Sequence, residues 1–244
     1  MIPKSHPKYE SLKTRELIVS GVKKGITSVH GLIAHGRGEA FDYLLGEKTS
    51  DFAKKSVDSA AALLLLAKNP VISVNGNVAA LVPKELAKLS SILNAPLEIN
   101  IFHQSRSREL GIKKHLIKHG AENVLLPDKK YKIKFLESNR KYVTSEGILQ
   151  ADVVFVPLED GDRTEALIKN GKKVITIDLN PLSRTAQKAT ITIVDNITRA
   201  ILLLINQIQK FKKLKLAKKQ LKVIYKHHDN QKRLKIAIKL IRRL

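Results

Sequence analysis

Six short apolar runs, separated by segments of helical pattern, constrain the fold of this chain more than any other feature of its sequence. The runs are residues 70–74, 97–102, 123–127, 151–157, 174–179 and 189–195. Continuous apolar strands are typical of parallel sheets that helices cover on both faces. Helical patterns over 83–93, 107–119 and 164–170 lie between the runs. We therefore expect an α/β fold built on a Rossmann-like, doubly wound, mainly parallel sheet.

Helical patterns also flank this alternating region on both sides. Residues 1–68 carry three of them, over 9–25, about 38–45 and 52–68, and the chain has a helical pattern again from Ile197 onward. We expect one Rossmann-like domain over 1–206, with an N-terminal helical segment, followed by a basic helical tail over 207–244. The Lys-rich stretch 129–146 has no periodicity from which a structure follows.

The charge of the chain is concentrated in the tail. The formal net charge is +23, and residues 207–244 hold 14 Lys and Arg against one Asp. Such a surface favours a polyanionic partner, so contact with nucleic acid through the tail is one interpretation. Leu214, Ala217, Leu221 and Ile224 recur at helical spacing, and a second apolar series ends at Leu244, which suggests that one face of the tail is buried.

Several classes of protein are disfavoured by what the sequence lacks. There is no cysteine, which excludes disulfides and thiolate chemistry. The longest apolar run, 60–67, is far shorter than the roughly 20 residues that a membrane-spanning helix needs. The first four residues lack the apolar core of a secretory signal. We expect a cytoplasmic protein without a membrane segment.

Polar side chains follow five of the six predicted strands, at the edge of the sheet where open α/β folds bind ligands. They are Asn75 and Asn77; His103, Gln104 and Arg106; Glu159, Asp160, Asp162 and Arg163; Asp178, Asn180, Arg184 and Thr185; and Asp195, Asn196 and Arg199. Turns favour Asn, Asp and Gly in any protein, and this alternative accounts for the Asn-Gly pairs but not for the arginines. The arginines indicate an anionic ligand.

Two features of this set leave alternatives open. Carboxylates of Asp160 and Asp162, beside Glu159, could hold Mg²⁺ together with phosphate, or they could belong to an exposed acidic turn. Arg37 stands between Gly36 and Gly38 before the predicted helix 38–45. It could bind an anion together with backbone N–H groups, or be a solvated residue of a flexible loop. Neither a dinucleotide fingerprint nor a Walker A motif is present.

Long ordered blocks of the sequence resemble the archaeal phosphopantothenate synthetases. The blocks are "HPKYESLKTREL", "GLIAHGRGEAFDYLLGEKT", "PVISVNGNVAALVP" and "ADVVFVPLEDGDRTEALIKNGKKVITIDLNPLSRTAQKATITIVDNITRA". The resemblance covers about residues 2–205 and is looser over 103–150. The tail after about residue 206 departs from the pattern of the family.

The resemblance implies an ATP-dependent, AMP-forming ligase of coenzyme A biosynthesis, which is a homodimer. It would join 4-phosphopantoate to β-alanine through an acyl adenylate and release diphosphate. The resemblance also implies the residues that contact ATP. These are Arg15, Arg37, Asp178, Leu179, Asn180, Arg184, Thr185, Asp195 and Asn196.

Further roles are hypotheses from the chemistry of such a reaction. Two anionic substrates repel each other unless cations offset the repulsion, and Arg37, Arg163, Arg184 and Arg199 are candidates for this. We assign catalytic roles to Arg37, Arg163 and His35, the last as acceptor of the β-alanine proton, although a structural His35 is an equal alternative. Substrate-binding candidates are Asn75, Asn77, His103, Arg106 and Arg199. The competing interpretations are a nucleic-acid-binding protein and another nucleotide-binding α/β enzyme, such as a dehydrogenase.

Overall fold

The computed structural model describes residues 3–103 and 105–242. Gln104 and Leu244, which the sequence places at a strand exit and on the apolar face of the tail, lie outside the described residues.

Six parallel strands form the central sheet and confirm the predicted fold class. They are β1 (Pro70–Val74), β2 (Leu97–Ile99), β3 (Val124–Leu125), β6 (Val153–Phe155), β7 (Lys173–Ile177) and β8 (Ile191–Ile193). Their order is β3-β2-β1-β6-β7-β8, and every neighbouring pair is parallel. This is the strand order of the Rossmann fold, so the direction of winding reverses between β1 and β6, where such folds bind ligands.

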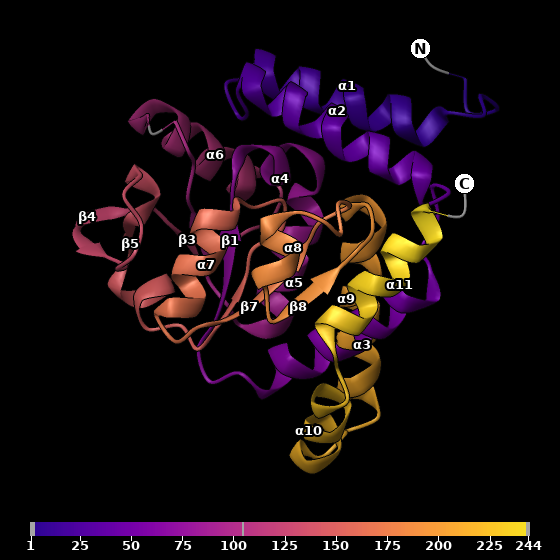
Figure 1. The fold of residues 1–244 in the computed structure, drawn as a ribbon. Coiled ribbons are helices and arrows are strands. Elements are labelled where there is room, and N and C mark those ends of the chain that lie inside the picture. Colours follow the sequence, from indigo (N-terminus) through magenta and orange to yellow (C-terminus); the bar gives the residue numbers. More distant parts are fainter. Residues whose placement is uncertain (1–2, 104, 243–244) are drawn as a thin grey trace.

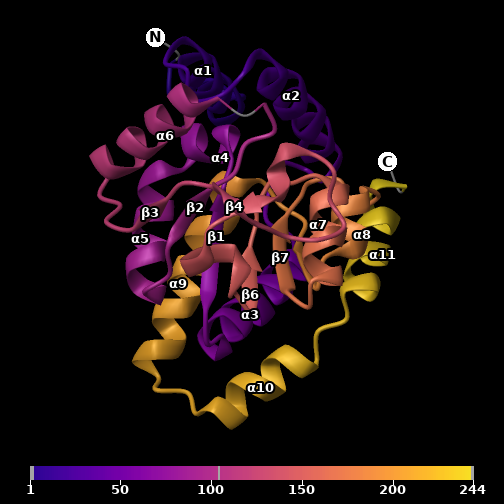
Figure 2. The ribbon, with the colours of Figure 1, turned by 90° about the vertical axis from the view of Figure 1, so that its left-hand side faces the viewer.

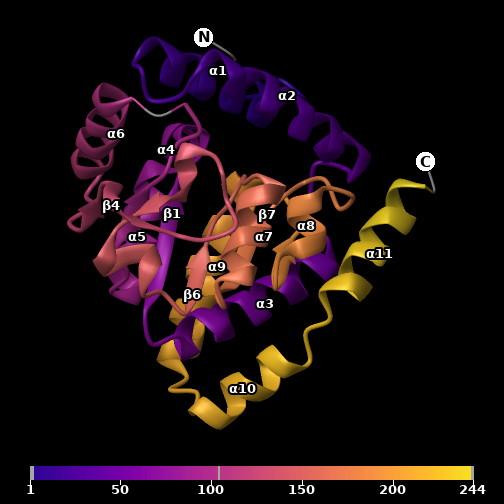
Figure 3. The ribbon, with the colours of Figure 1, turned by 60° about the vertical axis from the view of Figure 1, so that its left-hand side comes forward.

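Helices cover both faces of the sheet (Figure 3). One face carries α3 (Asp51–Leu66), α5 (Pro83–Leu93) and α9 (Ile197–Lys213), and the other carries α7 (Gly161–Lys169) and α8 (Arg184–Lys188). Short α4 (Gly76–Leu81) follows β1, and α6 (Arg106–Lys118) packs beside α5. Strands β1, β6 and β7 contribute to both cores: in β6, for example, Val153 and Phe155 belong to the larger core, and Val154 belongs to the smaller one. This double burial is the reason for the continuous apolar strand sequences.

The Lys-rich stretch is ordered and takes the place of a helix beside α7. It forms an antiparallel pair, β4 (Asp128–Lys132) and β5 (Tyr142–Val143), followed by a helical turn, Ser145–Leu149. Its few apolar side chains, among them Ile133, Val143 and Ile148, are buried against β6 and α7. Because exposed lysines stand between these few buried residues, the sequence shows no regular apolar spacing that would reveal their place in the core.

Two antiparallel helices, α1 (Tyr9–Lys23) and α2 (Val29–Leu44), lie across the carboxyl ends of the strands (Figure 1). The predicted start of the second helix near residue 38 is wrong, because α2 begins at Val29. Gly36-Arg37-Gly38 is therefore helical, and its N–H groups lie within the helix instead of forming an anion-binding loop. The glycines of α2 allow close packing: a Cβ at Gly31 would lie 2.3 Å from the Asn77 Oδ1 atom.

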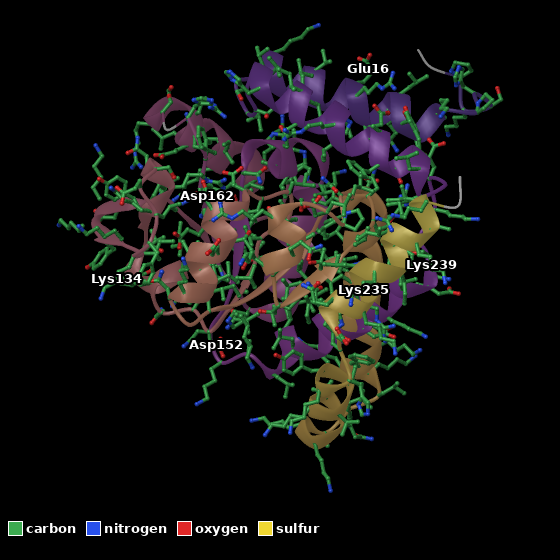
Figure 4. All side chains as sticks on the ribbon, viewed as in Figure 1. Glu16, Lys134, Asp152, Asp162, Lys235 and Lys239 are labelled. Carbon is green, nitrogen blue, oxygen red and sulfur yellow. The ribbon has the colours of Figure 1, made fainter. Side chains whose placement is uncertain are left out.

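The tail continues the fold of the body. Helix α10 (Lys218–Lys226) lies across the far end of α3, and α11 (Asn230–Ile241) runs back along the β8 edge of the molecule (Figure 2). Leu221 and Leu234 are buried in the larger core. The Asn230 side chain accepts a hydrogen bond from the Thr192 N–H at 2.8 Å and so covers the free edge of the sheet. The opposite face exposes lysines, such as Lys235 and Lys239 (Figure 4).

No helix within the described part of the chain combines the length and apolar character needed to cross a membrane.

Candidate active site

A cavity of about 2040 Å³ lies between the α1–α2 hairpin and the carboxyl ends of the strands. Most of the predicted site residues line it, although they come from five separate stretches of sequence. These are His35, Arg37, Asn75, Asn77, Asp160, Asp162, Arg163, Asp178, Leu179, Asn180, Arg184, Thr185, Asn196 and Arg199. Arg15, His103, Arg106 and Asp195 do not line it.

The loop after β7 is held in shape by its own polar groups. The Asp178 carboxylate accepts hydrogen bonds from the Asn180 N–H at 2.9 Å and from the Ser183 hydroxyl. The Asn180 side chain accepts from the Leu182 N–H at 2.9 Å, and Ser183 caps α8 through the Ala186 N–H. Burial raises the pKa of Asp178, and Arg37 acts in the opposite direction. This stiff loop presents Asp178, Leu179 and Asn180 to the cavity.

Arg184 and Thr185, at the start of α8, contact α7 and the loop between β6 and α7. The exposed Arg184 guanidinium pairs with Asp162 and, at 2.6 Å, with Glu165. Hydrogen bonds from Lys169 and Arg184 lower the pKa of Glu165 to about 2. The Thr185 hydroxyl donates to the Glu159 carbonyl oxygen at 2.7 Å. Arg184 is therefore held at the cavity by two carboxylates.

The loop after β8 connects the sheet to α2. Asp195 is 2% exposed and accepts hydrogen bonds from Thr49 at 2.6 Å and from Arg199 at 2.7 Å. Asn196 caps α9 and donates to the Asp42 carboxylate at 2.9 Å. Arg199, in the first turn of α9 as predicted, also pairs with Asp42. This network sets the position of α2 above the cavity.

On the hairpin, Arg15 pairs with Glu39, and His35 stands one helical turn before Glu39 on α2. Arg15 donates to Glu39 at 2.9 Å and to the Tyr43 hydroxyl at 2.8 Å, so its charge is already partnered. The Nε2 atom of His35 is buried and has no hydrogen-bond partner among the residues that the structure describes. Burial lowers the pKa of His35, with a smaller opposing effect from Glu39. Burial thus favours the neutral form of His35, which lines the cavity with its Nε2 unpartnered among the described residues.

Arg37 differs from the other predicted arginines. Arg15, Arg106, Arg163, Arg184 and Arg199 each form an ion pair, whereas Arg37 forms none with the described residues. It is exposed on α2, in the wall of the cavity and within the electrostatic reach of Asp178. Gly38, the next residue, faces Leu179, since a Cβ there would be in ordinary van der Waals contact with the leucine Cδ1 at 3.8 Å. Arg37 offers an uncompensated positive charge to an anionic ligand.

The acidic loop after β6 combines one buried carboxylate, Glu159, with two exposed ones, Asp160 and Asp162, and each of the three pairs with an arginine. The Glu159 side chain is 0% exposed and pairs with Arg163 at 2.7 Å and with Arg140. Asp160 pairs with Arg140 at 2.7 Å, and Asp162 pairs with Arg184. Within residues 3–103 and 105–242, no three His, Asp or Glu side chains form a group that could hold a metal ion.

The predicted substrate residues after β1 have structural partners. Asn75 caps α4 through the Val78 N–H and donates to the Pro157 and Leu158 carbonyl oxygens at 3.2 and 2.9 Å, across the switch between β1 and β6. Asn77 donates to the Gly31 carbonyl oxygen at 2.9 Å and accepts from Thr27. Both lie at the cavity wall and hold its parts together.

His103 and Arg106 lie away from the main cavity. The His103 ring packs against His30 of α2 with the ring centroids 4.7 Å apart. Arg106 pairs with Glu109 at 3.3 Å and lines a separate, smaller hollow. β2 ends at Ile99, three residues before the predicted end at 102, so these residues follow a longer loop than expected.

Sequence reasoning missed Glu39, Tyr43 and Arg140. Glu39 and Tyr43 stand one helical turn apart on α2, and such a spacing on a recognised helix would have placed them on one face with His35. Arg140 comes from the stretch without periodicity, and nothing in its local sequence indicates its buried position.

Comparisons with known proteins support one family. The profile described as phosphopantothenate/pantothenate synthetase matches residues 52–244. The chain is 60% identical over 202 residues to a 4-phosphopantoate–β-alanine ligase of Thermococcus onnurineus, covering 82% of this chain and 77% of the relative. It is 51% identical over 237 residues to the protein of the same name from Methanosarcina mazei, covering 97% and 92%.

These matches confirm the resemblance drawn from the sequence and correct its extent. The family profile continues to residue 244, so the expectation that the tail departs from the family pattern is wrong. The packing of α10 and α11 into the common core gives the physical reason, because the tail is part of the fold.

Proposed function

The chain belongs to the phosphopantothenate/pantothenate synthetase family, and from this premise we propose that it joins 4-phosphopantoate to β-alanine at the expense of ATP. The products are 4′-phosphopantothenate, AMP and diphosphate, and the reaction serves coenzyme A biosynthesis. Family membership also argues against an unrelated nucleotide-binding α/β enzyme.

The observation that carries the proposal is the uncompensated guanidinium of Arg37 at the cavity. Arg37 lies within the electrostatic reach of Asp178, and the next residue of α2 approaches Leu179, on the loop expected to contact ATP. A guanidinium that has no carboxylate partner and stays charged at any working pH is suited to bind phosphate. We propose that Arg37 binds ATP phosphates, while Arg184 and Thr185 approach them from the start of α8.

The remaining chemistry requires positioning and one proton transfer. The substrate carboxylate would attack the α-phosphorus of ATP to form an acyl adenylate, and the β-alanine amine would then displace AMP. No protein nucleophile is needed, so catalysis rests on orientation and on cations that stabilise developing charge. We propose that the Nε2 of His35 takes the ammonium proton, since burial lowers the pKa of the imidazole and so favours its neutral form.

We expect Mg²⁺ to accompany ATP, because Mg²⁺ is commonly held by phosphates together with one or two carboxylates. Asp160 and Asp162 are the candidate carboxylate ligands, but each is already neutralised by an ion pair, Asp160 with Arg140 and Asp162 with Arg184. The protein residues alone therefore do not fit a resident Mg²⁺. The assignment can be tested by measuring the Mg²⁺ dependence of ATP affinity in Asp160→Asn and Asp162→Asn variants.

The decisive experiment measures AMP release in the presence of ATP, β-alanine and either 4-phosphopantoate or pantoate. We expect AMP with the phosphorylated acid and much less with pantoate. Equal AMP release with the two acids would show that the substrate assignment is wrong, and no AMP with either would remove the proposed reaction.

Two further proposals concern assembly and location. We propose that the protein is a homodimer, as the resemblance implied, which light scattering of the purified protein would test. We place its activity in the cytoplasm, where ATP-dependent biosynthesis occurs.

A second candidate function is nucleic-acid binding by the tail, favoured because no Lys or Arg of residues 207–242 forms an ion pair within the described structure. A salt-dependent shift of labelled RNA by the protein would test it.

A further inference from the structure

Arg140 is the centre of a buried polar network that the proposed reaction has not yet used. It is 4% exposed. Its Nε donates to the Asn100 side chain at 2.8 Å, and its Nη2 donates to the Asn100 carbonyl oxygen at 3.2 Å. The outer nitrogens also bind Glu159 and, at 2.7 Å, Asp160. These contacts join the end of β2 to the loop that follows β6.

Glu159 passes this constraint on to two residues of the cavity. Its carboxylate accepts a hydrogen bond from the Arg163 Nη1 at 2.7 Å, and its carbonyl oxygen accepts one from the Thr185 hydroxyl at 2.7 Å. Thr185 belongs to the expected ATP site and Arg163 to the expected charge clamp. The conformation of Glu159 therefore sets the position of Thr185 in the ATP site and of Arg163 in the charge clamp.

Arg163 is left with unsatisfied donors. Its side chain is 1% exposed, it borders the cavity in the first turn of α7, and its Nε and Nη2 atoms have no hydrogen-bond partner among residues 3–103 and 105–242. A buried charged donor without a partner is costly, so an acceptor is expected to complete it. In this cavity an anionic oxygen of a substrate, from a carboxylate or a phosphate, has the required chemistry.

We propose that Arg140 is a positioning residue: acting through Glu159, it orients Arg163 to receive an anionic group of the acid substrate and Thr185 to meet the nucleotide. This inference rests on the proposed function. A purely structural role predicts something different: breaking a buried ion pair would lower stability without a selective change in the KM for the acid substrate.

The test compares Arg140→Lys and Arg140→Ala with the unchanged protein. For each we would measure unfolding temperature, the KM values for 4-phosphopantoate, ATP and β-alanine, and kcat. We expect both variants to raise the KM for 4-phosphopantoate by about tenfold or more, because misplacing a binding group by 1 Å can cost up to about a hundredfold. The KM for β-alanine should remain unchanged. Guanidinium ions added to Arg140→Ala should partly restore activity.

Arg108→Met is the matched control, because Arg108 is a half-buried arginine of α6 that donates to the His103 carbonyl oxygen and lies outside the cavity. Parallel losses in this variant would indicate a general structural effect and overturn the proposal. So would unchanged KM values for 4-phosphopantoate and ATP in folded Arg140→Lys, or failure of both Arg140 variants to fold.

The two proposals can fail separately. If the unchanged protein releases no AMP, the ligase assignment fails. The Arg140 proposal is then tested by calorimetric titration of ATP and of 4-phosphopantoate into the unchanged protein and Arg140→Lys. Binding of both ligands that the substitution leaves unaltered, or no binding of either by the unchanged protein, would overturn it.

Discussion

Arg199 and Asp42, which are 157 positions apart in the sequence, form a two-pronged ion pair between the first turn of α9 and the end of α2. The Nη2–Oδ1 distance is 2.5 Å and the Nη1–Oδ2 distance is 3.2 Å. Arg199 also binds Asp195, and Asp42 also accepts from Asn196. The hairpin that covers the cavity is therefore fastened to the sheet at the expected nucleotide site.

Replacing Asp42 should loosen this attachment. Asp42→Asn leaves Arg199 with one carboxylate in a mostly buried place, and we expect a loss of about 1–3 kcal/mol in the free energy of unfolding. Weaker binding of ATP should accompany it, since α2 carries Arg37. Urea denaturation and calorimetry provide the measurements. Asp51→Asn, at an exposed position on α3, is the control; equal effects of the two substitutions would contradict the prediction.

Removing the charge of Arg37 should abolish most activity without affecting the fold. Arg37 forms no ion pair with the described residues, so Arg37→Ala should leave the unfolding temperature nearly unchanged. We expect AMP formation to fall by about a hundredfold, as for other single electrostatic groups at a reacting centre. The control is Lys23→Ala at an exposed position on α1. Near-normal turnover of Arg37→Ala would exclude it from the site.

The pH dependence of kcat tests His35. Burial lowers its pKa in the folded protein below 6.5, so the imidazole stays neutral at pH 7 and protonates only as the pH falls below that value. Activity should decline on the acid side below pH 6.5, and His35→Gln should lower kcat at pH 7.5 by about a hundredfold and remove this decline. His227→Gln, exposed at the end of α10, should change neither. A normal kcat for His35→Gln would leave His35 with a structural role.

The lowered pKa of His35 also predicts how the stability of the protein depends on pH. Because the folded-state pKa of His35 is depressed, the unfolded state binds more protons between that pKa and 6.5. Stability should therefore fall as the pH falls through this window, and His35→Gln should weaken that dependence. Thermal unfolding from pH 5 to 8 measures it, and identical pH profiles for the two proteins would count against the assignment.

The tail should unfold together with the body. Leu221 of α10 is 6% exposed and belongs to the main core, whereas Leu214 is 58% exposed. We expect Leu221→Ala to lower the free energy of unfolding by about 2–4 kcal/mol and Leu214→Ala by less than about 0.5 kcal/mol. Denaturant unfolding followed by circular dichroism compares them. A separate early transition for α10 and α11 would show that the tail is an independent appendage.

Local sequence predicted the sheet well because each strand is buried on both faces. Val71–Val74 and Val174–Ile177 are apolar at nearly every position, and that pattern does not depend on which strand lies beside which. The gathering of polar residues after the strands could be predicted as well, since the carboxyl ends of parallel strands lie at one edge of the sheet. Most of the residues identified in this way do line one cavity.

Two kinds of feature were beyond local sequence. The start of α2 was misplaced because Gly31, Gly36 and Gly38 reduce helix propensity, whereas packing of the helix against Asn77 and Leu179 favours it. The stretch containing Arg140 has no periodicity, because only a few of its side chains are buried and its anchor is a polar network.

By itself, the sequence determined the strands of the main sheet, the edge at which ligands meet the sheet, and the family. Only the tertiary structure decided which charges are compensated: Arg37 has no ion-pair partner in the described part of the chain, Arg199 is bound to Asp42, and Arg140 and Arg163 share Glu159. The physical reason is that the buried residues of a helix or strand recur at a regular spacing along the sequence, so neighbouring residues reveal them. An ion pair depends on the distance between two atoms that folding brings together from remote parts of the chain.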